Sequence, residues 1–245
     1  MRTSLVVLLA LLGAALAASG ALVALGLKAP LALRELGLYY VLNTIRDCAS
    51  PEAVAAIVWD YRGLDTIYET AVLYFALVGG LAIFRAAKAQ GFKKPVGLTE
   101  LSKTSTRLIS LLIAAVSVCI ALHGHLTPGG GFPGGSALAV VAMLAVPIYS
   151  VNSMLERGIT STKLIAVRGA ALTALGLVAL LPVIRGLEIV TNQRFYPGAV
   201  LGFTISGSIS MYNFFEFMAV ASGFAALALY LSIPEEAFRE VVERG

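Results

Sequence analysis

Long apolar runs alternate with short polar segments along most of the chain. A bilayer core needs roughly 20 consecutive apolar residues for each helical span, and the runs meet this length or approach it. The pattern therefore predicts an all-α, polytopic integral membrane protein with about six transmembrane helices. The predicted spans are residues 4–27, 69–84, 108–122, 134–151, 164–184 and 211–233.

The first run, 4–27, follows Arg2 and contains small residues that could imitate a signal-peptidase site. The apolar part of a signal peptide is usually about 7–15 residues long, whereas this run continues to Lys28. Its length favours a retained span, and a cleaved signal peptide is the alternative.

Basic residues suggest how the chain is oriented in the cell membrane. The segment 85–107 is the most basic of the chain and has Glu100 as its one acidic residue. Lys and Arg in short loops favour the cytoplasmic side, so this segment and the loop 152–163 are expected there. With six spans, both termini are then cytoplasmic, and the turn near Pro128 and the segment 185–210 are external.

The amino-acid composition is typical of a protein surrounded by lipid, and it argues against nucleic-acid binding, metal binding and catalysis. Of the residues, 58% are hydrophobic and 13% are charged, and the mean hydropathy is +0.87. No basic patch is interleaved with aromatic residues, so nucleic acid is not an expected partner. Cys48 and Cys119 are too far apart in sequence for a disulfide framework or a Cys-x-x-Cys metal site. We expect no metal, no other cofactor and no catalytic residues, because no nucleophile–base set occurs.

The sharpest local pattern is a turn rich in glycine and proline, from His123 to Gly135, between two predicted spans. Its irregular backbone leaves amides without helical partners, so it cannot face lipid. It either forms a tight hairpin or lines an ion or water path. His123 and His125 lie two residues apart near a helix end and point to different faces, which favours proton relay or amide capping over a metal site.

Charged residues gather just before the second predicted span. Asp65 and Glu69 are four residues apart and share one helical face, where they could concentrate cations or pass protons. The structural alternative is a capping box formed by Thr66 and Glu69, with Arg62 neutralising Asp60 or Asp65.

Another carboxylate, Glu216, lies at the start of the last predicted span. A charge at mid-bilayer costs roughly 2.5–3.5 kcal/mol, so Glu216 should face protein or water, and a carboxylate at the membrane interface is the alternative. An interfacial aromatic belt is predicted to contain Trp59, Tyr39, Tyr40 and Tyr196.

The turn from His123 to Gly135 resembles the G-H-x-x-P-G-G-G-F-x-G-G signature of the B-type (MnhB/MrpB) subunit of Mrp cation/proton antiporters. Leu126 stands where that family usually has Asn, and Pro133 stiffens the turn further. The segment from Val58 to Thr70 resembles the D-[FY]-R-x-x-D-T-x-x-E-T segment in the C-terminal part of the Mrp A-type subunit. The same segment occurs alone in the E-type (MbhE) subunit of membrane-bound hydrogenases.

These resemblances imply two units, a two-span MbhE/MrpA-like unit at 1–95 and a four-span MnhB/MrpB-like unit at 96–245. They imply a non-catalytic membrane subunit of a multisubunit Na+/H+ antiporter module, which helps to line the ion path and to assemble the complex. Its partners would be the other subunits, the transported Na+ and H+, and the lipid bilayer. The alternative is a structural adapter in a membrane-bound hydrogenase or sulfane-reductase respiratory complex. The ion-path candidates are Asp60, Arg62, Asp65, Thr66, Glu69, His123, His125 and Glu216, and the structural-motif residues are Gly124, Pro128, Gly129, Gly130, Gly131, Phe132, Gly134 and Gly135.

Overall fold

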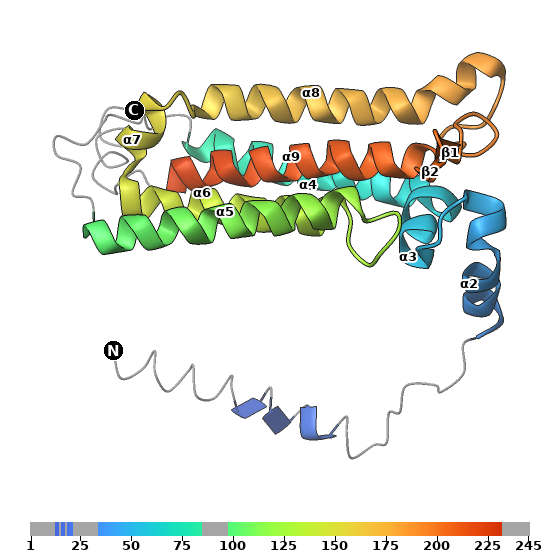
Figure 1. The fold of residues 1–245 in the computed structure, drawn as a ribbon, viewed down its shortest axis with the longest axis horizontal. Coiled ribbons are helices and arrows are strands. Elements are labelled where there is room, and N and C mark those ends of the chain that lie inside the picture. The colour runs from blue at the N-terminus through green and yellow to red at the C-terminus, as the bar shows by residue number, and fades with distance from the viewer. Residues whose placement is uncertain (1–12, 15, 18, 22–33, 85–97, 232–245) are drawn as a thin grey trace. The chain divides into compact units, whose positions relative to one another are not determined.

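The computed structural model describes residues 13–14, 16–17, 19–21, 34–84 and 98–231 (Figure 1). The chain forms two compact units, Met1–Tyr39 and Tyr40–Gly245. Of the predicted span 4–27, the few described residues are helical, and the rest lies outside the described residues. The predicted boundary between 95 and 96 also lies outside them and stays a prediction.

Five helices in the described part of the second unit are long and apolar enough to cross a membrane. They are α4 (Gly63–Phe84), α5 (Glu100–Leu122), α6 (Gly131–Tyr149), α8 (Ser161–Leu180) and α9 (Ser208–Leu231). The 3-10 helix η2 (Leu181–Arg185) extends α8. This architecture confirms the predicted all-α, polytopic membrane fold.

Each of these helices begins earlier than its predicted span. Hydropathy marks only the apolar part of a helix, whereas a polar first turn belongs to the helix as well. The side chain of Thr99 caps α5 by accepting from the amide of Ser102, and Thr160 caps α8 by accepting from the amide of Lys163. Caps of this kind satisfy amides that have no partner inside the helix.

Helix α9 is the centre of the bundle. It packs against α6 and α8, while α5 packs against α6 and α4 lies along α9 (Figure 1). In the most apolar stretch of α9, 56% of residues are buried, compared with 11% for α4. Helix α4 therefore offers most of its apolar surface to lipid or to other proteins.

The spans alternate in direction, so α4, α6 and α9 begin at the end of the bundle where α5 and α8 finish (Figure 1). We call this end, formed by residues 40–62, 123–130 and 186–207, the polar end. The secondary structure near it comprises α2 (Glu35–Cys48), α3 (Ala53–Ala56), the π-helix η1 (Ile57–Tyr61) and the antiparallel strands β1 (Ala199–Val200) and β2 (Phe203–Thr204).

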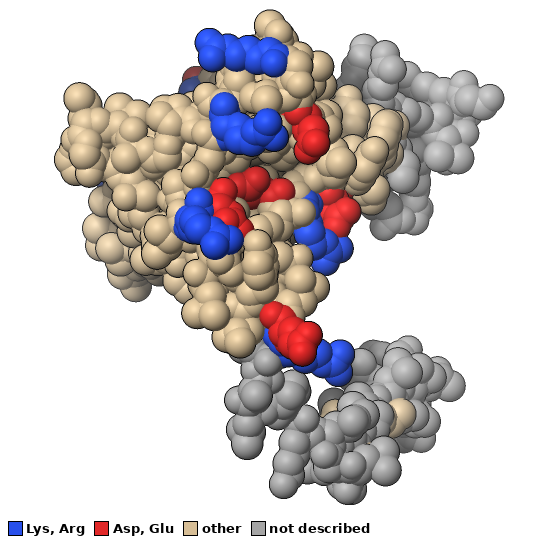
Figure 2. All heavy atoms as spheres, turned by 90° about the vertical axis from the view of Figure 1, so that its right-hand side faces the viewer, with Lys and Arg blue, Asp and Glu red and all other residues tan. Residues whose placement is uncertain are grey.

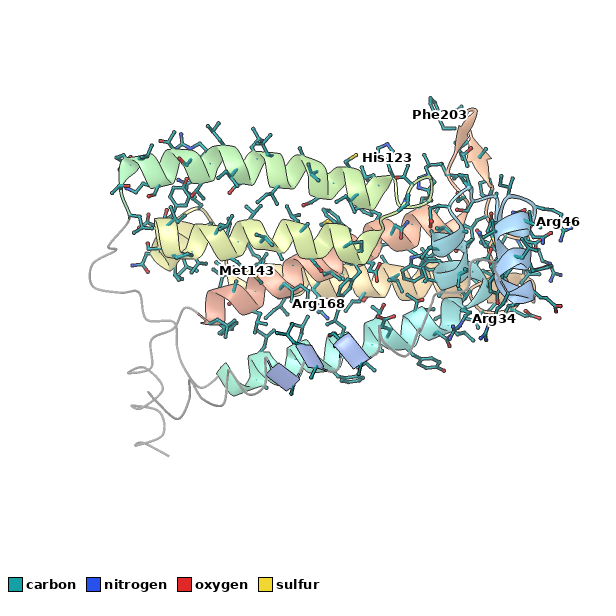
Figure 3. The ribbon with its side chains drawn as sticks, turned by 90° about the horizontal axis from the view of Figure 1, so that it is seen from below. Arg34, Arg46, His123, Met143, Arg168 and Phe203 are labelled. Carbon is teal, nitrogen blue, oxygen red and sulfur yellow. The ribbon has the colours of Figure 1, made fainter. Side chains whose placement is uncertain are left out.

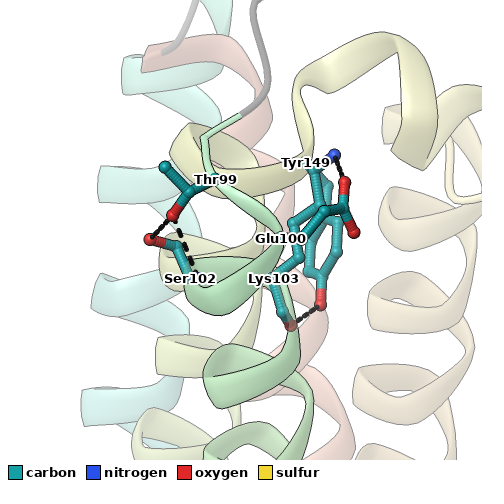
Figure 4. A network of polar contacts seen from close by, with 5 residues as sticks. All are labelled: Thr99, Glu100, Ser102, Lys103 and Tyr149. Carbon is teal, nitrogen blue, oxygen red and sulfur yellow. Dashed lines mark hydrogen bonds and ion pairs between the residues drawn. The ribbon is translucent and has the colours of Figure 1, made fainter.

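At the opposite end, polar contacts fasten α5 to α6 (Figure 4). The Tyr149 hydroxyl donates to the carbonyl of Lys103 at 2.5 Å, and Lys103 pairs with Glu100 at 2.7 Å. The segment 152–163, predicted as a loop, contains most of a short helix, α7 (Val151–Glu156). This helix forms because the Ser150 side chain caps it by accepting from the amide of Ser153.

Candidate functional site

The two sequence motifs meet at the polar end, through the first turns of α9. Trp59 Nε1 donates a hydrogen bond to Asn213 Oδ1 at 3.0 Å, and its ring stacks on that of Tyr212 with centroids 4.7 Å apart. On the glycine-rich turn, the amide of Phe132 donates to Glu216 Oε2 at 2.9 Å. One helix therefore carries residues that hold the charged segment on one side and the glycine-rich turn on the other.

Glycines let the turn pass close to α9. A Cβ at Gly131 would lie 2.6 Å from the Cβ of Glu216, and a Cβ at Gly124 would lie 2.5 Å from the Cα of Gly130. Gly130 itself has a φ of +135°, a conformation that L side chains rarely adopt. Within the turn, Pro128 and Gly129 are exposed.

The first turn of α6 is packed just as closely. A Cβ at Gly134 would lie 2.8 Å from that of Ala121 on α5, and a Cβ at Gly135 would lie 2.8 Å from that of Val220 on α9. Small residues at such positions let helix backbones approach each other in a membrane. The turn thus positions α6 between α5 and α9.

The two histidines have different surroundings. His125 is buried, with Nε2 at 3.0 Å from the carbonyl of Thr204, whereas His123 is exposed and contacts the carbonyl of Cys119 in its own helix at 3.1 Å. Burial lowers the pKa of His125, so the fold favours its neutral form with Nε2 donating to Thr204. Ser50 reaches the same place and donates to the carbonyl of His125 at 3.0 Å.

Beside this junction the polar end is hollowed by a cavity of about 500 Å³. In Figure 2, acidic side chains lie in the middle of this end and basic side chains flank them. The charged residues that line the cavity are Asp47, Asp60, Arg62, Asp65, Glu188 and Arg194. Four carboxylates and two guanidinium groups give the lining a formal excess of negative charge.

Asp60 is held in this lining by Asn192, a buried residue of the loop between α8 and α9. Asn192 Nδ2 lies 3.1 Å from Asp60 Oδ2 and 3.2 Å from the carbonyl of Cys48, and its Oδ1 accepts from the amide of Ser208 at 2.8 Å. Burial raises the pKa of Asp60, and hydrogen bonds from Cys48 and Asn192 act in the opposite direction. Burial at this place thus favours the protonated form of Asp60.

Arg62 neutralises Asp65, one of the two partners that the sequence allowed. Its Nη2 lies 2.5 Å from Asp65 Oδ2, and both side chains are more than half exposed. The alternative capping box is wrong, because α4 begins at Gly63 and Thr66 therefore lies inside the helix. Instead, Thr66 Oγ1 donates to the carbonyl of Val58 and ties η1 to α4.

Glu69 lies one turn beyond Asp65 on α4 and is exposed on the surface of this chain. Its charge is close enough to that of Glu216 on α9 for the two carboxylates to repel each other. Glu216 in turn lies at the N-terminal end of α6, where the helix dipole favours negative charge. The two candidate carboxylates thus lie on adjacent helices, α4 and α9, within reach of each other's charge.

The predicted aromatic belt is wrong for two of its four residues, Trp59 and Tyr196. Trp59 is 1% exposed in the core, and Tyr196 is buried with its hydroxyl donating to the carbonyl of Val178 at 2.6 Å. The loop between α8 and α9 contributes Tyr196 and Val190 to the same core, so aromatic side chains at this boundary pack against protein.

Among the buried polar residues that were not predicted from the sequence, three matter most for the site and for the core of the bundle: Asn192, Asn213 and Arg168. Asn192 lies in the loop between α8 and α9, which has no hydrophobic periodicity, and Asn213 lies near the start of the last span. Nothing in the sequence around either residue indicates that it is buried. Arg168 had a signal, because it is a basic residue inside the apolar run 164–184.

Residues 101–226 match a family model described as a domain related to the MnhB subunit of Na+/H+ antiporter. An uncharacterised protein of Methanocaldococcus jannaschii is 30% identical over 122 residues, which cover 43% of this chain and 47% of that protein. The B-type subunit of a Na+/H+ antiporter of Bacillus subtilis is 41% identical over 56 residues, or 22% of this chain and 39% of that protein. The chain thus spans less than half the length of these curated relatives.

Two solved structures share the fold over 96% of the chain. One is the Mrp complex from Dietzia sp. DQ12-45-1b, with a TM-score of 0.69 and 22% identity over 26% of the matched chain. The other is the membrane-bound sulfane sulfur reductase, an archaeal respiratory membrane complex, with a TM-score of 0.71 and 26% identity over 100% of the matched chain. Since the family model covers more than half of its residues, this protein belongs to the family of domains related to the MnhB subunit of Na+/H+ antiporters.

Proposed function

We propose that this chain is a non-catalytic membrane subunit of a multisubunit Na+/H+ antiporter module and contributes carboxylates to the cation or proton path. One observation carries the proposal: an acidic cavity lies at the polar end where α4 begins, and the neighbouring membrane-spanning helices α4 and α9 each carry a carboxylate, Glu69 and Glu216. Carboxylates inside membrane spans are costly and mark ion pathways or proton relays.

The proposed path begins at the cavity and continues along α4. Asp60 and Asp65 line the cavity, and Glu69 follows Asp65 by one helical turn. The excess of acidic groups attracts cations to the cavity, because a cleft lined by one sign of charge raises the local counter-ion concentration. Glu69 is exposed on α4, so the path lies along the outer face of this chain, where another subunit covers it.

The same geometry assigns an assembly role to the glycine-rich turn. Its contacts with α9 fix Glu216 relative to α4, so the turn sets the position of one path carboxylate without binding the ion. The two-unit organisation, 1–95 and 96–245, belongs to this proposal and rests on the two sequence motifs, one in each unit.

We place the polar end on the external side, which puts both termini in the cytoplasm when six spans are present. The basic loop 152–163 and the described start of α5, with Lys103 and Arg107, lie at the opposite end, and the positive-inside rule favours the cytoplasm for them. In a Cys119→Ser background, an impermeant maleimide added to intact cells should label Arg194→Cys and spare Arg157→Cys. If the reagent labels Arg157→Cys and spares Arg194→Cys, the chain has the opposite orientation and the polar end faces the cytoplasm.

A second candidate host is a respiratory complex in which the chain joins a redox arm to an ion-pumping arm. The match to the full length of a chain of the sulfane sulfur reductase favours this candidate. Purification of the native assembly in mild detergent, followed by mass spectrometry, separates the two. Antiporter subunits alone support a free-standing exchanger, and companions that bind iron–sulfur clusters or nickel support the respiratory complex. Recovery of the chain without membrane companions contradicts both.

A further inference from the structure

Arg168 is a buried basic residue in the membrane-spanning part of α8. The residue is 4% exposed, and Figure 3 shows it between the helices in the middle part of the bundle. It lies about 10 Å along the helix from Ser161. Such residues are rare in membrane spans, face the protein interior and usually serve a function.

The guanidinium is held by groups that carry no formal negative charge. Its Nη1 donates to the carbonyl of Ala219, about midway along α9, at 3.1 Å. Its Cζ lies 5.7 Å from the centre of the Tyr74 ring on α4. Space for the group exists because residue 223 is glycine, where a Cβ would collide with Arg168 Nη1.

The positive charge of Arg168 is not balanced within the described residues. No carboxylate among them lies within 4.0 Å of the guanidinium, and the buried Nε has no hydrogen-bond partner there. The Tyr74 ring face and the Ala219 carbonyl interact favourably with a cation but leave its net charge in place. A net positive charge is therefore fixed inside the bundle.

The position of this charge relates to the carboxylates. Tyr74 follows Glu69 along α4, and Ala219 follows Glu216 along α9, so Arg168 lies farther from the polar end than the carboxylate pair. Along the contact between α4 and α9, the negative groups Glu69 and Glu216 thus lie nearer the polar end, and the positive group of Arg168 lies deeper in the membrane.

We propose that Arg168 is an electrostatic barrier that stops cations from moving along this chain beyond Glu69 and Glu216. A fixed positive charge in a medium of low dielectric repels cations strongly, and arginines exclude protons and cations from other membrane pores by this means. The inference rests on the proposed path. It adds that the path along the outer face of α4 ends at the depth of Arg168, where the ion passes to a neighbouring subunit.

The test compares passive sodium leak in liposomes that contain the intact complex, with an imposed membrane potential and no proton gradient. Arg168→Gln keeps a donor for the Ala219 carbonyl and removes the charge, whereas Arg168→Lys keeps the charge. We expect radioactive sodium influx to rise by at least about tenfold in Arg168→Gln and to stay near the wild-type value in Arg168→Lys. Arg157→Gln is the matched control, because Arg157 also stacks on a tyrosine but lies on the surface.

Arg168→Met is a second charge-removing variant if Arg168→Gln does not assemble, since apolar replacement of a buried ion is often tolerated. A purely structural Arg168 would change the melting temperature of the complex but not the leak. The barrier proposal is wrong if the charge-free variant that assembles leaks sodium at the wild-type rate. It is also wrong if Arg168→Lys leaks as much sodium as the charge-free variant does. If Glu69→Gln leaves coupled exchange intact, the proposed path fails instead, and the leak measurement remains a separate result.

Discussion

Replacement of Glu69 by Gln is expected to reduce sodium-driven proton exchange by the reconstituted complex at least about tenfold, equivalent to about 1.4 kcal/mol. The substitution removes the charge at the seam between α4 and α9 and preserves the shape of the side chain. Glu69 is exposed on this chain, so the substitution removes little packing and its main effect is the loss of a charge that attracts cations. Quenching of a pH-sensitive dye in proteoliposomes, after a sodium pulse, measures the exchange.

Glu216→Gln extends the same test to the facing helix. Its amide oxygen can still accept the hydrogen bond from Phe132, so the variant should assemble normally and lose exchange as well. Glu156→Gln is the control, because Glu156 is exposed on α7 at the opposite end of the bundle. Normal exchange in both Glu69→Gln and Glu216→Gln would remove the carboxylates from the path and leave the chain an assembly role.

The membrane fold could be predicted from the sequence because its cause is local. A helix that crosses lipid must be apolar over most of its length, and the hydrophobicity of each residue can be read directly from the sequence. The glycine-rich turn was identifiable for a related reason. At Gly130 and Gly131 the backbone allows no side chain, which leaves a dense glycine pattern in the sequence.

The surroundings of the charged segment could not be predicted in the same way. Asp60 is held by Asn192 and Trp59 by Asn213, and each contact joins residues more than a hundred positions apart. Hydropathy does not record which loop folds onto which helix. An aromatic residue at a span end therefore resembles a lipid-facing one even when, as with Trp59, it is buried in protein.

The start of α4 shows the same limit on a smaller scale. Thr66 and Glu69 fit a capping box by spacing, but the helix begins at Gly63, separated by one residue from the end of the π-helix that contains Trp59. Gly63 packs closely enough that a Cβ would lie 2.5 Å from Cγ1 of Val190. The boundary is thus set by tertiary packing, and the local spacing of Thr and Glu was misleading.

Replacement of Gly131 by Ala is expected to destabilise the chain by about 2–3 kcal/mol, because overpacking of a tight contact typically costs 1–3 kcal/mol. The new Cβ would lie 2.6 Å from the Cβ of Glu216 and would also meet the carbonyl oxygen of Asn213, which belongs to the backbone and cannot rotate away. A melting temperature lower by roughly 4–12 °C should follow in a thermal unfolding assay of the purified complex.

The matched control is Gly176→Ala on α8, where a Cβ would meet no atom within 4 Å. Alanine is the better helix former by roughly 0.5–1 kcal/mol, so this variant should melt at or slightly above the wild-type temperature. The displacement in Gly131→Ala also moves the Phe132 amide away from Glu216, so exchange should fall even in the complexes that remain assembled. If the Gly131→Ala complex has the wild-type melting temperature and the wild-type rate of exchange, α6 and α9 can move apart by the width of a methyl group at no cost. The glycine-rich turn would then not be what positions Glu216.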